Sequence, residues 1–299
     1  MDDRAERAEA ARRRREEEDY AQGVLDILQL EDEADPDILT AYDLIDAGRL
    51  AARHDDEDYR TAAERAAADR SWTFGHVIVD EAQELSPMAW RVLMRRCPSR
   101  SMTLVGDVAQ TGDLSGTDSW SAALAPYVED RWRLTELTVN YRTPAEIMAV
   151  AAEVLAMLAV DIEPPRSVRQ TGVRPWRSAV DSVPDAVAGL VRDHDEPGTL
   201  AVLAPESLVE AVGRAVVESV PDAGFGDQPD LENKVVVLTV RQAKGLEFDS
   251  VLLVEPAAVI DESSRGLNDL YVALTRATRQ VGVVHSGALP RVLEELSAR

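Results

Sequence analysis

An apolar run that ends in two adjacent carboxylates constrains the fold of this chain more than any other feature of its sequence. Residues 77–79 (Val-Ile-Val) lead directly into Asp80 and Glu81, and Ser86 then opens an amphipathic segment. A run bounded in this way predicts a buried strand of a parallel sheet. Ligands of open α/β sheets bind beyond the carboxyl ends of the strands, so Asp80 and Glu81 are expected beside a substrate. One carboxylate could hold Mg²⁺ while the other activates a water, and the alternative is an ordinary acidic turn.

Further apolar runs alternate with amphipathic segments along the remainder of the chain. Strands are predicted at residues 102–105, 134–139, 200–203, 235–240, 251–254 and 281–284, and helices at 88–96, 187–192, 207–220, 267–277 and 290–296. Another helix should begin with Thr143 as its cap and Pro144 in its first turn, whereas residues 160–185 are predicted to be a connection. Strands that alternate with helices indicate an α/β fold with parallel sheets and right-handed crossovers.

Composition limits the classes of protein and partner that fit this chain. A length of 299 residues allows two domains, and no apolar run approaches the length of a membrane span. No signal peptide is visible, and the single cysteine, Cys97, cannot form an internal disulfide, so a cytoplasmic protein without a membrane partner is expected. The formal net charge of −23 opposes nucleic-acid binding at long range. A protein partner is therefore expected more strongly than bare DNA.

Two further polar segments follow predicted strands and could complete a nucleotide site. Residues 106–112 form a loop with glycine at both ends, in which Gln110 can donate to a γ-phosphate and accept from a water. Arg142 stands just ahead of a predicted helix, where its guanidinium could reach across a cleft. Taken alone, residues 106–112 would be better explained as an ordinary polar loop between a strand and a helix, and Arg142 as a surface residue. The interpretation depends on their occurring together.

The ordered set of these segments resembles the superfamily 1 helicases of the UvrD/Rep type. Residues 77–83 are similar to motif II, 104–110 to motif III, 140–143 to motif IV, 239–248 to motif V and 270–277 to motif VI. Five motifs in this order are highly specific. The resemblance implies two RecA-like parallel-sheet domains. We expect an acidic helical lead-in or insertion at residues 1–70. The end of an incomplete first RecA-like domain should span residues 71–139, and the second RecA-like domain residues 140–299.

The resemblance also implies a DNA helicase-type ATP hydrolase that uses ATP and Mg²⁺, and it assigns roles in the first domain. Asp80 would hold Mg²⁺, and Glu81 would activate the hydrolytic water. Gln110 would contact the γ-phosphate of ATP. These roles suit phosphoryl transfer, in which the protein mainly positions groups and stabilises charge.

In the second domain, the resemblance makes Arg142 and Arg276 arginine fingers. Glu247, together with the backbone of Lys244 and Gly245, would contact nucleotide or couple it to movement along a track. A guanidinium delivered across a closing cleft stabilises the charge that spreads over the γ-phosphoryl oxygens in the transition state.

Within the superfamily, residues 85–90 and 138–148 resemble the HelD/HelR branch, which comprises bacterial ATPases that bind RNA polymerase and release it from nucleic acid. RNA polymerase is therefore the expected partner, with release or recycling of the enzyme as the expected function. Three departures from the unwinding enzymes are visible. The sequence contains no Gly-Lys-Ser/Thr, Gln110 is not followed by an aromatic residue, and Arg241 replaces a usual histidine.

These departures leave three functions open. The first is an ATP-driven motor, or its C-terminal part, that acts on RNA polymerase. The second is a DNA helicase or translocase of the repair type, which the charge and the missing aromatic oppose. The third is a binding module that does not hydrolyse ATP, which the absent phosphate-binding lysine favours.

Overall fold

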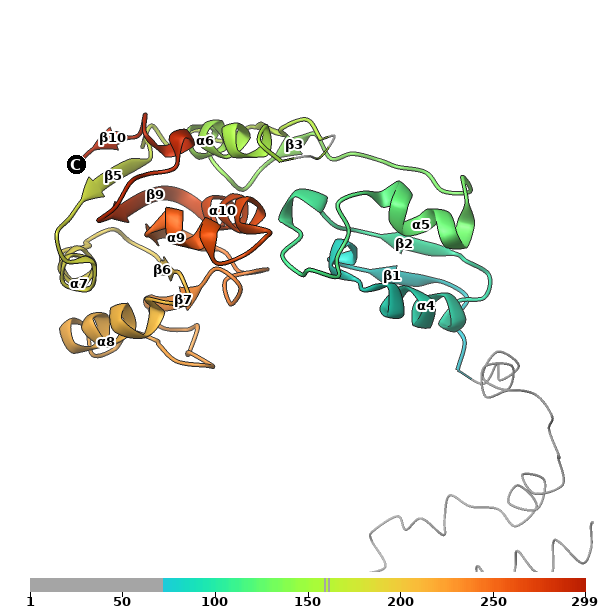
Figure 1. The fold of residues 1–299 in the computed structure, drawn as a ribbon, viewed down its shortest axis with the longest axis horizontal. Helices are drawn as coiled ribbons and strands as arrows, with labels where there is room; N and C mark the ends of the chain where they lie inside the picture. Colours follow the sequence, from blue (N-terminus) through green and yellow to red (C-terminus); the bar gives the residue numbers. More distant parts are fainter. Residues whose placement is uncertain (1–71, 159, 161) are drawn as a thin grey trace, which may run out of the picture. The chain divides into compact units, whose positions relative to one another are not determined.

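A six-stranded parallel sheet organises the second half of the chain in the computed structural model, which describes residues 72–158, 160 and 162–299 (Figure 1). The strand order is β10-β5-β9-β8-β6-β7. The strands are β5 (Trp176–Ala179), β6 (Leu200–Ala204), β7 (Val235–Thr239), β8 (Phe248–Val254), β9 (Ala277–His285) and β10 (Ser297–Ala298). Every neighbouring pair is parallel, so the predicted α/β class is confirmed. The helical lead-in predicted for residues 1–70 lies outside the described residues.

Helices cover both faces of this sheet, and alternate residues of the strands pack against each layer. Leu203 and Leu253 belong to the apolar cluster that contains α6 (Ala145–Leu155) and α10 (Gly266–Thr275). Their neighbours Val202 and Leu252 belong to a second cluster, with α7 (Val183–Arg192) and α8 (Val209–Ser219). A short helix, α9 (Pro256–Asp261), follows β8 and contributes Val259 to the first cluster. Burial on both faces explains why these strands appear in the sequence as continuous apolar runs.

A smaller two-stranded parallel sheet carries the first acidic motif. Its strands are β1 (Val77–Val79) and β2 (Met102–Leu104), and α4 (Pro87–Arg96) and α5 (Trp120–Val128) supply the cluster beside it. Ser86 caps α4 by accepting the Ala89 amide at 3.2 Å. The prediction that β1 is buried is wrong, because its central residue, Ile78, is 73% exposed. Among the described residues, only one face of this sheet is covered by an apolar layer.

Three predictions of local structure are also wrong. Residues 134–139 form only a two-residue strand, β3 (Val139–Asn140), which pairs with β4 (Arg166–Ser167), and Leu137 is 83% exposed. The predicted connection at 160–185 contains β4 and β5. The predicted closing helix is a single 3₁₀ turn, η4 (Arg291–Leu293), followed by the edge strand β10. Each error concerns short or partly polar segments, whose structure depends on pairing with distant strands.

The start of α6 differs from its prediction as well. Pro144, not Thr143, precedes the first helical residue, and no side chain caps the helix. Thr143 is 1% exposed, and its hydroxyl has no hydrogen-bond partner among the described residues. In the first turn of α6, the carboxylate of Glu146 accepts the amides of Thr171 and Gly172, at 3.3 and 2.7 Å.

The single cysteine, Cys97, is fully buried. Within residues 72–299, apart from 159 and 161, no helix combines the length and the apolar composition that a bilayer crossing requires.

Gly282 in the centre of β9 should tolerate substitution poorly. A Cβ at this position would lie 2.3 Å from Cζ2 of Trp176, the residue opposite on β5. We expect Gly282→Ala to lower the free energy of unfolding by about 1–3 kcal/mol, because the indole must move within a packed layer. Gly189→Ala in α7 is the matched control, since its nearest neighbour would be 3.8 Å away. That substitution should stabilise the chain by up to about 1 kcal/mol. Urea unfolding measures both, and equal effects would contradict the packing argument.

Candidate nucleotide site

The two acidic residues lie directly beyond the end of β1, as predicted. Asp80 and Glu81 are both exposed, and Asp80 Oδ1 accepts the amide of Glu81 at 2.9 Å. Glu81 has φ 49° and ψ 39°, a left-handed conformation that is uncommon for a residue with a side chain. Such strained positions are frequent at functional sites, where the surrounding contacts hold them. Here the holding contact is Gln83 Nε2, which donates to Glu81 Oε2 at 2.6 Å.

Gln83 connects the first acidic motif to the loop after β2. Its side chain is fully buried, and its Oε1 accepts the amide of Asp107 at 3.1 Å while its Nε2 binds Glu81. The Asp107 carboxylate in turn accepts the Ala109 amide at 2.9 Å and Gln110 Nε2 at 2.8 Å. A continuous chain of hydrogen bonds therefore runs from Glu81 to Gln110. Gln83 and Asp107 lie within the segments similar to motifs II and III, but nothing in the sequence marks them as the connecting residues.

Gln110 is the residue at which the two halves of the site meet. It ends η3 (Val108–Gln110), a 3₁₀ turn, and its side-chain Oε1 accepts Arg276 Nη2 at 2.8 Å. Its backbone oxygen accepts Lys244 Nζ at 2.6 Å. Two groups predicted to contact the same phosphate, Gln110 and Arg276, thus lie in contact although they are 166 residues apart in the sequence.

Arg276 is buried and held by several acceptors. The side chain is 2% exposed and donates to the carbonyl oxygens of Val272 at 3.2 Å and Leu246 at 3.3 Å, in addition to Gln110. Burial, followed by the nearby Arg142, lowers the pKa of Arg276 to about 10, and carboxylates including Glu81 act in the opposite direction. The guanidinium therefore stays positively charged at neutral pH. A desolvated, preorganised cation of this kind suits stabilisation of phosphoryl charge.

Arg142 forms a separate and more exposed pair. It follows β3, where Asn140 Oδ1 accepts its amide at 2.8 Å, and its Nη1 lies 2.7 Å from Glu247 Oε1. The two side chains are 35% and 51% exposed. Gly245, with φ 76°, supplies the left-handed turn that leads into Glu247 and β8. The structure thus pairs Arg142 with Glu247. Among the described hydrogen bonds, none joins Asp80 or Gly245 to the side chain of another predicted site residue.

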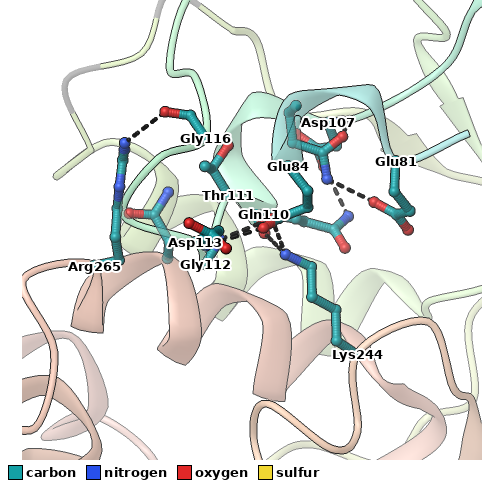
Figure 2. A network of polar contacts seen from close by, with 12 residues as sticks. Glu81, Glu84, Asp107, Gln110, Thr111, Gly112, Asp113, Gly116, Lys244 and Arg265 are labelled. Carbon is teal, nitrogen blue, oxygen red and sulfur yellow. Dashed lines mark hydrogen bonds and ion pairs between the residues drawn. The ribbon is translucent and has the colours of Figure 1, made fainter. Parts of the chain in front are cut away.

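Two more residues, one in α10 and one directly before it, contact the loop after β2. Asn268 in α10 donates to the carbonyl oxygen of Ala109 at 2.9 Å. Arg265 donates to the carbonyl oxygen of Gly116 at 3.3 Å (Figure 2). Asn268 is 6% exposed. No feature of the sequence marks these residues, because amides and arginines on a helix are most often at the surface.

A cavity of about 770 Å³ lies beyond the carboxyl ends of β6 and β7. Its lining combines acidic and basic side chains, among them Glu84, Arg241, Lys244 and Glu262. None of the predicted catalytic or nucleotide-binding side chains lines it. The Glu262 carboxylate is bound by the amides of Glu206 and Ser207, at 2.8 and 2.9 Å.

The donor set is compatible with Mg²⁺ without forming a complete metal cage. No group of three or more His, Cys, Asp or Glu side chains in the described part of the chain is placed to hold a metal ion. Magnesium usually takes one or two carboxylates and completes its shell with phosphate oxygens and waters. The exposed Asp80 carboxylate at the end of β1 fits this mode.

Comparison with known proteins gives one family match and several distant structural similarities. Residues 234–284 match the family model described as UvrD-like helicase C-terminal domain. No curated protein matches the chain. The C-terminal domain of a possible DNA helicase from Lactobacillus plantarum WCFS1 is 23% identical with a TM-score of 0.40, and the match covers 52% of this chain and 94% of that one.

Two viral structures are similar at the same level. The PRRSV helicase is 19% identical with a TM-score of 0.40, over 70% of this chain and 34% of that one. The arterivirus nonstructural protein 10 helicase is 15% identical with a TM-score of 0.39, over 74% and 41%. At these scores the structural similarities carry no information on activity or substrate.

The matched segment contains several of the residues described above. It includes β7, β8 and α10, together with Lys244, Glu247 and Arg276. The UvrD-like part of the resemblance is confirmed for this segment, whereas the HelD/HelR branch is not shown. Residues 234–284 are therefore similar to the C-terminal domain of UvrD-like helicases.

Proposed function

We propose that these residues form part of the nucleotide site of an ATP-hydrolysing superfamily 1 helicase-type motor. The observation that carries the proposal is the contact between Gln110 Oε1 and Arg276 Nη2 at 2.8 Å. It joins the segment after β2 to the end of α10, so one phosphate group could be reached from both. Glu81 is linked to the same point through Gln83 and Asp107.

Each side chain has a defined task in such a site. Glu81 orients or deprotonates the attacking water, and Gln110 presents an amide that can donate and accept at once. Arg276 and Arg142 place positive charge where the γ-phosphoryl oxygens gain negative charge. Mg²⁺, held by Asp80, would neutralise phosphate charge. For Arg142 to reach nucleotide, its guanidinium must turn from Glu247, which the exposure of both side chains permits.

The 299-residue chain on its own should hydrolyse ATP negligibly. Backbone amides of a phosphate-binding loop and its lysine supply the main grip on the phosphates, and the sequence has no Gly-Lys-Ser/Thr. Phosphate release by the purified chain should therefore equal that of Glu81→Gln at every ATP concentration. Turnover that disappears in Glu81→Gln would contradict this expectation and would show that the chain binds phosphate in another way.

We further propose that the partner of this motor is RNA polymerase and that nucleotide controls release of the polymerase. The net charge of −23 opposes a nucleic-acid track, whereas the basic channels of a polymerase attract an acidic protein. The lack of an aromatic residue after Gln110 removes a base-stacking contact of roughly 1–3 kcal/mol.

Purified components can separate the two kinds of partner. The chain should co-elute with bacterial core RNA polymerase in size-exclusion chromatography at physiological salt, and fluorescence anisotropy should show weak, salt-sensitive binding to single-stranded and duplex DNA. Tight, salt-resistant DNA binding without polymerase binding would instead favour the repair-type helicase or translocase.

A further inference from the structure

The carboxylate of Glu84 collects three hydrogen-bond donors from two distant parts of the chain. Glu84 ends η2 (Ala82–Glu84), the 3₁₀ turn that follows the strained Glu81. Its Oε1 accepts the amide of Gly112 at 2.9 Å, its Oε2 accepts the amide of Asp113 at 3.0 Å, and Lys244 Nζ also donates to Oε1 (Figure 2). Nothing in the sequence distinguishes this carboxylate from its acidic neighbours.

Lys244 is shared between Glu84 and the backbone of Gln110. Its Nζ donates to the Gln110 carbonyl oxygen at 2.6 Å as well as to Glu84. The Lys244 and Glu84 side chains are only 20% and 25% exposed, so water screens their interaction less than it screens a surface pair. A partly buried pair contributes reliably only where other hydrogen bonds satisfy both ions, and here the amides and the carbonyl do so.

These contacts act on the backbone of Gln110 and on the residues that follow it. The amides held by Glu84 follow Gln110 by two and three residues, and the ammonium held by Glu84 binds the Gln110 backbone itself. The Gln110 side chain is meanwhile held between Asp107 and Arg276. Freeing the loop after Gln110 would therefore allow its side chain to leave Arg276.

We propose that Glu84 is a positioning residue that fixes Gln110 against Arg276. It acts through the loop amides and through Lys244, and it does not itself touch the reacting phosphate. Lys244 also precedes the turn at Gly245 and Glu247, so the same carboxylate links the loop after β2 to the turn after β7. The consequence for ATP turnover rests on the proposed function, whereas the positioning itself is a property of this chain.

The first half of the proposal, that Glu84 holds the loop amides, can be tested by amide exchange on the 299-residue chain. In Glu84→Ala, hydrogen–deuterium exchange of peptides covering residues 108–118 should accelerate about tenfold or more, because two amides lose their acceptor. Glu84→Gln should give a smaller acceleration, since a neutral amide oxygen still accepts, and it serves as the test variant if Glu84→Ala does not fold. Unchanged exchange in both variants would overturn the proposal.

A variant in which the charges of Glu84 and Lys244 are swapped tests whether Glu84 acts by accepting the loop amides or only by pairing with Lys244. The double variant Glu84→Lys with Lys244→Glu restores an opposite-charge pair but places an ammonium, which has no acceptor, beside the amides of Gly112 and Asp113. Hydrogen–deuterium exchange of residues 108–118 should therefore be as fast in this double variant as in Glu84→Ala. Full recovery of protection in the double variant would reduce Glu84 to an ion-pair partner and refute the role proposed for the amides.

The second half of the proposal concerns the Gln110 side chain. Its ¹H–¹⁵N side-chain signal, identified by its loss in Gln110→Met, should shift in Glu84→Gln although the melting temperature changes little. A purely structural role would lower the melting temperature and leave that signal in place. Neither measurement uses nucleotide, so absence of ATPase activity would not change them, and the two proposals fail separately.

Discussion

Arg142→Ala should lower the turnover number for ATP by about 10³ once a phosphate-binding loop is present, with little change in KM, because an arginine finger acts mainly on the transition state. The loop could come from a longer form of this polypeptide or from another chain. The same substitution should change the free energy of unfolding by less than about 1 kcal/mol, because the pair with Glu247 is exposed. Steady-state ATPase kinetics and urea unfolding measure the two effects.

Arg214→Ala is the matched control for this experiment. Arg214 also forms one exposed pair, with Glu210 on α8, and it lies in none of the motifs. We expect Arg214→Ala to leave the turnover number for ATP and the free energy of unfolding almost unchanged. A raised KM with unchanged turnover in Arg142→Ala would mean that this arginine binds nucleotide only in the ground state.

The central part of the fold could be predicted because its strands carry their own signal. All five residues of β6 are buried, and β7 and β8 are nearly so, which requires continuous apolar sequence. Such runs identify strands of a parallel sheet regardless of what lies beside them. The helices between them follow from amphipathic spacing.

The edge strand β10 and its neighbour β5 carry no such signal. β5 has the sequence Trp-Arg-Ser-Ala and is only partly buried, so its place beside β9 depends on Trp176 packing over Gly282. β10 is two exposed residues that pair with β5. Conversely, the apolar residues Leu134 and Leu137 suggested a strand but are exposed, because no neighbouring strand pairs with them among the described residues.

In the candidate nucleotide site too, some residues could be predicted from the sequence and others could not. Motif residues such as Glu81, Gln110 and Arg276 could be chosen from the sequence, because their order along the chain is specific. Their partners could not, since a hydrogen bond between residues 110 and 276 depends on how α10 packs against η3. Glu84 is the clearest example, because its three donors come from positions 28, 29 and 160 residues away.

Arg276 differs from Arg142 in ways that the sequence resemblance hides, and a stability measurement should reveal them. Arg276 is 2% exposed and satisfies the carbonyl oxygens of Val272 and Leu246 as well as Gln110 Oε1. Arg276→Ala would leave these acceptors without their donor in a site that water reaches poorly. We expect the free energy of unfolding to fall by about 3 kcal/mol, which is typical when one member of a buried charged network is removed.

Urea unfolding followed by circular dichroism checks this expectation, with an unchanged dependence on denaturant as evidence that the folded state is retained. Arg192→Ala is the control, because its pair with Asp193 on the surface of α7 is 62% and 74% exposed and should contribute almost nothing. A loss below about 1 kcal/mol in Arg276→Ala would mean that the acceptors rehydrate freely. Arg276 would then be available to turn towards a phosphate at little cost. A loss near 3 kcal/mol would instead mean that its guanidinium is held in place before nucleotide arrives, as electrostatic preorganisation requires.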